Sequence, residues 1–181
     1  MKKVILNLAV TLDGFIEGPN AEVDWCIMDD DMDFDSFLAS VDTIFYGRVS
    51  YDAWGTYQPD LDASLAEKTM WQTIHAKDKF IFSSQYRQDE HATFIQQDIV
   101  NRVNEIKKQD GQDIWLYGGA SLIKTFISAG LIDVYKLSVH PIVLGSGKPL
   151  FEGLKNRIGL RLTKTKVFKS GVVELTYEPV P

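Results

Sequence analysis

The sequence is poor in three features that mark common classes of protein. It has one cysteine, Cys26, among 181 residues, which excludes an internal disulfide and a zinc site built on cysteines. Its 19 basic and 25 acidic residues give a net charge of −6, whereas binders of nucleic acids or anionic membranes usually carry a basic face. No apolar run is long enough to span a membrane. We therefore expect neither a nucleic acid nor a membrane among its partners.

The start of the chain resembles a signal peptide only superficially. Its apolar run, residues 3–10, is short, Asp13 and Gly14 come soon after it, and no cleavage motif of small residues is present. We expect a cytoplasmic protein whose N-terminus leads directly into a strand. No linker or repeat divides the sequence, so residues 1–181 are predicted to form a single domain.

Apolar patterning predicts strands that alternate with helices along most of the chain. Strands are expected at 3–10, 43–46, 78–83, 93–95, 113–117 and 132–139, and helices at 32–40, beside Ser50, and at 62–76, 97–109 and 120–129. Two further extended runs, 159–169 and 172–178, flank a turn signal and predict a hairpin. This order predicts an α/β fold with a mostly parallel central sheet and an antiparallel C-terminal hairpin.

Several familiar motifs fail on their spacing. Residues 143–149 look like part of a P-loop, but Pro149 follows Lys148 where Ser or Thr is needed. The acidic run 29–35 lacks the glycine and the glutamate of a calcium-binding loop, and the three histidines show no ligand spacing. No Gly-x-Gly-x-x-Gly follows the first strand. We expect no metal site and no Rossmann-type site.

Glycines and hydroxyl side chains gather where the predicted strands end. Gly47 precedes Arg48 and Ser50, the strand 78–83 ends at Ser83-Ser84, and Gly118-Gly119 separate a strand from a helix. Ligands of parallel α/β sheets bind beyond the carboxyl ends of the strands. A guanidinium, hydroxyls and backbone N–H groups at a glycine turn all suit phosphate oxygens. The alternatives are a plain turn at the two glycines and at the serines, and a helix cap with a solvated arginine after Gly47.

These three segments, in this order, resemble the dihydrofolate reductases and the reductase domain of bacterial riboflavin biosynthesis, the RibD C-terminal domain. The motifs are Gly47-Arg48-Val49-Ser50, Ser83-Ser84-Gln85 and Gly118-Gly119. Two longer stretches, LAVTLDGFIEG (8–18) and SVHPIVLGSGKPLF (138–151), look more like the riboflavin type. The resemblance covers nearly the whole chain. It implies a dihydrofolate reductase-like three-layer sandwich with helices on both faces of the sheet.

The resemblance implies NADPH as the cofactor. Arg48 would contact the adenosine 2′-phosphate near Ser83, while Ser50 and the two glycines, joined by a cis peptide in that family, would hold the pyrophosphate. Residues 11–27 match a mobile flap over the nicotinamide. The implied cofactor-binding residues are Ala9 and Ile16, which border the nicotinamide, and Gly47, Arg48, Ser50, Ser83, Ser84, Gly118, Gly119, Ala120, Ser121 and Leu122.

The resemblance also implies one buried acid at the start of the first helix, which binds the substrate ring and assists its protonation. When the family pattern is matched at Trp25 and Phe34, the acid falls on Asp30. When it is matched at Gly47, the acid falls on Asp31, so both remain candidates. A buried carboxylate with a raised pKa suits this chemistry. The alternative for these acids is a solvated helix cap.

The substrate is expected to contact Trp25, Phe34 and Trp54. Trp54 stands where folate enzymes have a smaller residue, which leaves less room for the tail of a folate. We therefore expect an NADPH-dependent reductase of a small planar heterocycle, a pterin or pyrimidine, or of a related carbonyl or imine. The alternatives are a riboflavin-pathway reductase of a phosphoribosylamino-pyrimidine and a nucleotide-binding protein without catalysis. Relatives of the riboflavin type are often dimers, so a homodimer is a further expectation.

Overall fold

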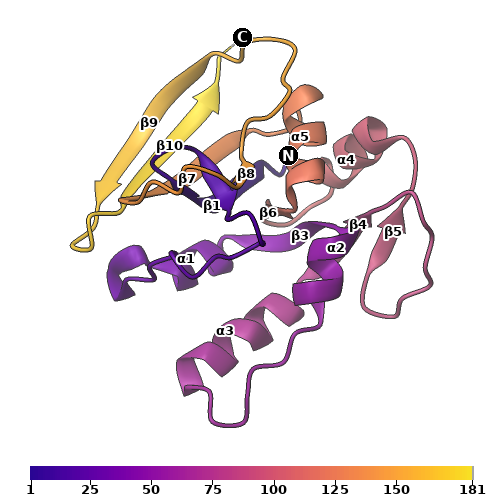
Figure 1. Cartoon of the computed structure of the whole chain (residues 1–181). Coiled ribbons are helices and arrows are strands. Elements are labelled where there is room, and N and C mark those ends of the chain that lie inside the picture. The colour runs from indigo at the N-terminus through magenta and orange to yellow at the C-terminus, as the bar shows by residue number, and fades with distance from the viewer. Residues whose placement is uncertain (181) are drawn as a thin grey trace. The chain divides into compact units, whose positions relative to one another are not determined.

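A computed structural model of the chain describes residues 1–180, and for Asp30 it describes the backbone alone. The chain divides into two compact units, which we describe separately (Figure 1). The first unit contains Met1–Lys2 and Asp33–Gly119, and the second contains Lys3–Met32 and the chain from Ala120 onward. The expectation of a single domain stays a prediction.

The first unit is built on a parallel sheet. Its strands lie in the order β5 (Thr93–Ile95), β4 (Asp78–Phe82), β3 (Val41–Gly47) and β6 (Asp113–Gly118), and each neighbouring pair is parallel. Its helices are α1 (Phe34–Ala39), α2 (Arg48–Ser50), the π-helical turn η2 (Tyr51–Gly55), α3 (Leu65–His75) and α4 (Ile99–Lys107). Parallel neighbours need a crossover connection, which α3 supplies between β3 and β4. Helix α4 connects β5 to β6, which lie on either side of β4 and β3.

The second unit combines parallel and antiparallel pairs. Its strands lie in the order β1 (Val4–Thr11), β7 (Val134–His140), β10 (Val173–Pro179) and β9 (Leu160–Val167); β1 and β7 are parallel and the other two pairs are antiparallel. A separate pair joins β2 (Phe15–Glu17) to β8 (Lys148–Pro149). The 3₁₀ turn η1 (Asp30–Met32) and helix α5 (Ala120–Ser128) complete the unit.

The expected α/β fold with mainly parallel pairing and a C-terminal hairpin is confirmed, and the ends of the expected elements lie within three residues of the observed ones. Long apolar strands explain this agreement. In β3, for example, Thr43 to Tyr46 are all buried, the pattern of a strand covered on both faces. No helix among residues 1–180 has both the length and the apolar character that crossing a membrane requires.

Two local features differ from the expectation. Strand β2 lies within residues 11–27, which were expected to form a flap, and it pairs with β8. Strands of two or three residues leave no periodic pattern in the sequence, so this pair was not predicted. The short helix after Gly47 continues as the π-helical turn. A Cβ on Gly55 would lie 2.0 Å from the ring of Tyr51, so glycine is what allows this buried ring to pack there.

Candidate functional site

The three predicted phosphate-binding segments follow neighbouring strands of the first unit. β3 lies between β4 and β6, and Gly47 at its end pairs with Phe82, the residue before Ser83. On the other side Tyr46 pairs with Gly118. The parallel strands therefore bring the three segments to one edge of the sheet, as expected for a ligand site. That they bind a nucleotide stays a prediction.

The double glycine contacts the segment that follows β3. The backbone N–H of Gly119 donates to Ser50 Oγ over 3.0 Å. A Cβ on Gly119 would lie 2.9 Å from the same oxygen, so the close approach depends on glycine. Gly118 has φ +102°, a backbone conformation that residues with a Cβ rarely adopt.

The expected cis peptide between Gly118 and Gly119 is wrong: no peptide bond among residues 1–180 is cis. A cis bond between residues other than proline costs about 2.5–4 kcal/mol. The chain turns here through the positive φ of Gly118 instead. Because Ser50 accepts the Gly119 N–H, a phosphate oxygen at this N–H would take the place of the hydroxyl.

The contact predicts how alanine at position 119 affects stability. Gly119→Ala is expected to lower the free energy of unfolding by about 1–2 kcal/mol, because its Cβ would displace Ser50 Oγ. In a Ser50→Ala background this oxygen is absent, so the same change should cost at least about 0.5 kcal/mol less. Urea unfolding of the wild type, both single variants and the double variant measures the coupling. Strictly additive costs would contradict the contact.

Arg48 and the two serines lie at the surface of the first unit. The Arg48 side chain is 46% exposed, and its Nη1 donates to Asp52 Oδ2 over 2.9 Å. Ser83 is half-buried, and its Oγ accepts the backbone N–H of Gln85. Ser84 is exposed. These groups are accessible to a ligand, but Arg48 already has a carboxylate partner.

The cofactor residues predicted in the second unit differ in exposure. Helix α5 begins at Ala120, directly after Gly119, with Ser121 exposed. The Leu122 side chain is buried, so any contact from Leu122 to a phosphate would come from its backbone. Ala9 on β1 and Ile16 on β2 are half-buried.

Asp13 organises the loop that was expected to be a flap. Its carboxylate accepts hydrogen bonds from Thr11 Oγ1 at 2.7 Å and from the N–H groups of Leu144 and Gly145 at 3.2 and 2.8 Å. The Thr11 hydroxyl above all, then these N–H groups, lower the pKa of the Asp13 carboxyl. The two stretches that resemble the riboflavin type are thus joined through one side chain. No motif in the sequence indicated this role; the only signal was an Asp-Gly pair just after a strand.

The acidic stretch gives little support to a buried acid at Asp31. The side chain of Asp31 is exposed, and its backbone oxygen accepts a hydrogen bond from Lys166 Nζ. Asp30 belongs to η1, but its side chain lies outside the described residues. Half-buried Asp29 accepts the hydroxyl of Ser170. The burial expected of a catalytic acid is therefore not found at Asp31.

The three predicted substrate-binding aromatic residues have different surroundings. Trp25 is buried in the second unit, and Phe34 in the first unit packs with its ring centroid 5.7 Å from that of Trp115. Trp54, on η2, is 38% exposed and stacks on Trp71, with ring centroids 6.0 Å apart and planes 9° apart. Of the three, Trp54 offers the most exposed ring.

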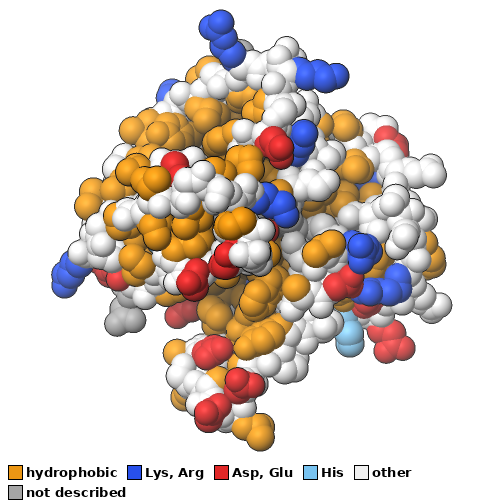
Figure 2. Space-filling model, in the orientation of Figure 1, with side chains coloured by type: hydrophobic (Ala, Val, Ile, Leu, Met, Phe, Trp, Pro, Cys, Tyr) orange, Lys and Arg blue, Asp and Glu red, His pale blue; other side chains and the backbone are white. Residues whose placement is uncertain are grey.

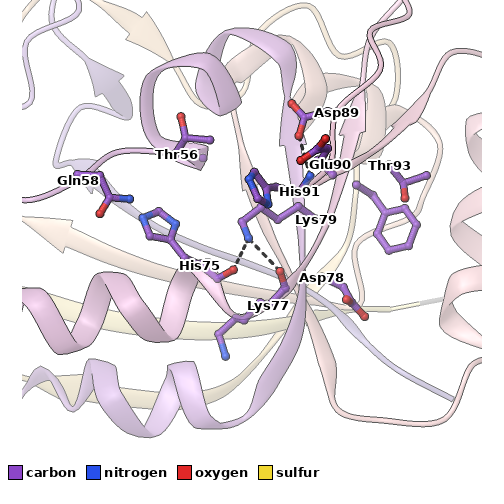
Figure 3. Close-up of a pocket in the computed structure, with 13 residues that line it drawn as sticks. Thr56, Gln58, His75, Lys77, Asp78, Lys79, Asp89, Glu90, His91 and Thr93 are labelled. Atoms are coloured by element: carbon purple, nitrogen blue, oxygen red, sulfur yellow. Dashed lines mark hydrogen bonds between the residues drawn. The ribbon is translucent and has the colours of Figure 1, made fainter.

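A pocket of about 670 Å³ lies elsewhere in the first unit, beside the first halves of β4 and β5 (Figure 3). Lys79 lies at this pocket almost fully buried, and its Nζ donates to the backbone oxygens of His75 and Lys77, shown as dashed lines. Burial lowers the pKa of Lys79. None of the predicted site residues lines the pocket. Within residues 1–180 no group of three or more His, Cys, Asp or Glu side chains is placed to hold a metal ion.

The chain resembles known proteins over nearly its whole length. Residues 2–174 match the RibD C-terminal domain. YyaP of Bacillus subtilis (strain 168) is 55% identical over 177 residues, which cover 97% of this chain and 94% of YyaP.

Two solved structures share the fold. One is named "Putative riboflavin biosynthesis protein", from Shewanella sp. PV-4; it has a TM-score of 0.79 at 21% identity, with both chains fully covered. The other is dihydrofolate reductase from Enterococcus faecalis complexed with NADP(H) and RAB-propyl, with a TM-score of 0.66 at 15% identity over 99% of this chain and 97% of the reductase. These likenesses confirm the dihydrofolate reductase-like fold, and the match over residues 2–174 shows that the chain belongs to the RibD C-terminal domain family.

Proposed function

We propose that the protein is an NADPH-dependent reductase that transfers a hydride to a C=N or C=O bond of a small planar heterocycle of the pterin or pyrimidine type. The observation that carries the proposal is the meeting of Gly47-Arg48, Ser83-Ser84 and Gly118-Gly119 at one edge of the sheet of the first unit. Family membership and the fold shared with a dihydrofolate reductase that binds NADP(H) support it.

The residues at this edge fit the phosphates of a dinucleotide. The Gly119 N–H donates to a serine hydroxyl that a phosphate oxygen can replace, and no Cβ blocks the approach. The Arg48–Asp52 pair is an exposed i,i+4 pair, worth about 0.3–0.5 kcal/mol, so a phosphate can compete for the guanidinium. When bound, the reduced nicotinamide would supply the hydride, and Ala9 and Ile16 are proposed to border it.

The substrate also needs a proton, which we assign to the acids before α1. A carboxylic acid within reach of a ring nitrogen can deliver a proton as the hydride arrives. Asp30 and Asp31 stay the two candidates, and the exposure of Asp31 makes Asp30 the stronger one. Trp25 and Phe34 are proposed to contact the same substrate.

The exposed indole of Trp54 favours a compact, flat substrate. An aromatic heterocycle can stack on its ring, since Trp71 already supports the indole by a near-parallel contact. Family membership favours a second candidate, a riboflavin-pathway reductase of a phosphoribosylamino-pyrimidine. The exposure of Asp31 favours a third, a nucleotide-binding protein without catalysis.

The test is the transfer of deuterium from NADPH labelled at C4 of the nicotinamide, in both stereochemical forms. The purified protein is incubated separately with pterins, with pyrimidines including a phosphoribosylamino-pyrimidine, and with small carbonyls. The masses of the products are then measured by mass spectrometry. We expect one label to give a heterocyclic product one mass unit heavier. Saturable binding of NADPH without transfer to any compound would support the third candidate instead.

A further inference from the structure

Arg87 lies on the loop between β4 and β5, four residues after Ser83. Its Nη1 donates to Asp52 Oδ1 over 2.8 Å and its Nη2 to Asp89 Oδ2 over 3.3 Å. The guanidinium carbon lies 5.5 and 5.1 Å from the ring centroids of Tyr51 and Phe94. The pKa of Arg87 is raised, mainly by its hydrogen bond to Asp52. This guanidinium is charged and fixed in position, although its side chain is 47% exposed.

Asp52 brings Arg87 next to the predicted phosphate ligand Arg48. The two arginines donate to opposite oxygens of its carboxylate, Arg48 to Oδ2 and Arg87 to Oδ1. Figure 2 shows basic side chains against acidic ones over α2 and the loop before β5. Two positive groups therefore share one carboxylate at the surface of the first unit.

Both guanidiniums keep donors for a further anion. A guanidinium carries five N–H groups. Within residues 1–180, Arg48 donates one side-chain hydrogen bond and Arg87 donates two. A phosphomonoester presents three terminal oxygens and up to two negative charges, so two half-exposed guanidiniums can bind it together. Because Asp89 and the rings of Tyr51 and Phe94 also contact Arg87, the side chain loses little conformational freedom on binding.

We infer that Arg87 is a second cofactor-selecting residue, which binds the 2′-phosphate of NADPH together with Arg48, in competition with the carboxylate of Asp52 that contacts both guanidiniums. The inference rests on the proposed function, because it needs NADPH at this edge of the sheet. It adds a residue outside the three motifs that suggested the cofactor. It also makes Asp52 a competitor of the phosphate for both arginines.

The test measures dissociation constants of NADPH and NADH, by energy transfer from tryptophan to the nicotinamide, for four variants. Arg87→Ala should weaken NADPH roughly 10-fold or more and NADH by less than about twofold. Asp52→Asn removes the competing charge and should tighten NADPH by about two- to fivefold. Arg48→Ala tests the proposed function, and Arg102→Ala, at an exposed arginine paired with Glu105 on α4, is the matched control. Thermal unfolding checks that each variant is folded.

The outcomes separate the inference from the proposed function. If Arg48→Ala lowers the preference for NADPH and Arg87→Ala does not, the inference is wrong and the proposed function stands. If Asp52→Asn weakens NADPH as much as Arg87→Ala does, Arg87 acts by supporting η2 through Asp52, and direct contact is wrong. If the wild type binds no NADPH, both the proposed function and the inference fail.

Discussion

Arg48→Ala is expected to weaken NADPH binding by about 1.5–3 kcal/mol, which is roughly 10- to 150-fold, and to leave NADH binding nearly unchanged. The two cofactors differ by the 2′-phosphate, and the guanidinium after β3 is proposed to bind it by charge-assisted hydrogen bonds. Because the Arg48 side chain is 46% exposed, salt should screen this interaction, and the difference between the two cofactors should shrink as salt is added. Titrations of NADPH and NADH at two ionic strengths measure the effect.

The control for Arg48 is an arginine of similar exposure and pairing. Arg161 is 66% exposed and bonds Glu178 over 2.8 Å in the second unit, away from every predicted cofactor residue in sequence. Arg161→Ala should change neither dissociation constant. Equal weakening of NADPH and NADH by Arg48→Ala would show that Arg48 does not recognise the 2′-phosphate.

The double variant Asp30→Asn/Asp31→Asn is expected to lower turnover by about 100-fold or more, the usual contribution of a general acid. Asparagine keeps the size of the side chain but has no carboxyl proton to give to a ring nitrogen. NADPH binding should stay within about twofold of the wild type, since neither acid is proposed to contact the cofactor. Initial rates with the substrate found by label transfer, together with cofactor titration, measure both quantities.

Asp35 supplies the matched control for the acids. It lies in the first turn of α1, is exposed, and is not assigned to the site. Asp35→Asn should leave turnover unchanged, and the single variants should place the loss mainly at Asp30. A double variant that keeps the wild-type rate would show that neither acid protonates the substrate.

The order of elements and the meeting of the three segments at the strand ends could be predicted because both depend on local patterns. Buried strands such as β3 are continuous apolar runs, and glycine or serine marks where they end. Parallel pairing then places those ends along one edge of a sheet. The geometry of this candidate site can therefore be predicted by knowing which strands exist and that they run in parallel.

The remaining features depend on contacts between distant parts of the chain. Asp13 binds the N–H groups of Leu144 and Gly145, more than 130 residues away, and nothing local to Asp13 specifies them. The contact between Arg87 and Asp52 likewise joins the loop after β4 to η2. The expectation of a cis peptide came from the resemblance alone, and it is wrong: the backbone turns through the positive φ of Gly118 instead.

The central claim is that the edge formed by Gly47-Arg48, Ser83-Ser84 and Gly118-Gly119 binds NADPH. The most direct measurement is a titration of the wild-type protein with NADPH and NADH, followed by energy transfer from tryptophan and repeated by calorimetry. We predict saturable binding of one NADPH per chain, at least about 10-fold tighter than that of NADH. Absence of saturable NADPH binding, or equal affinity for the two cofactors, would contradict the account.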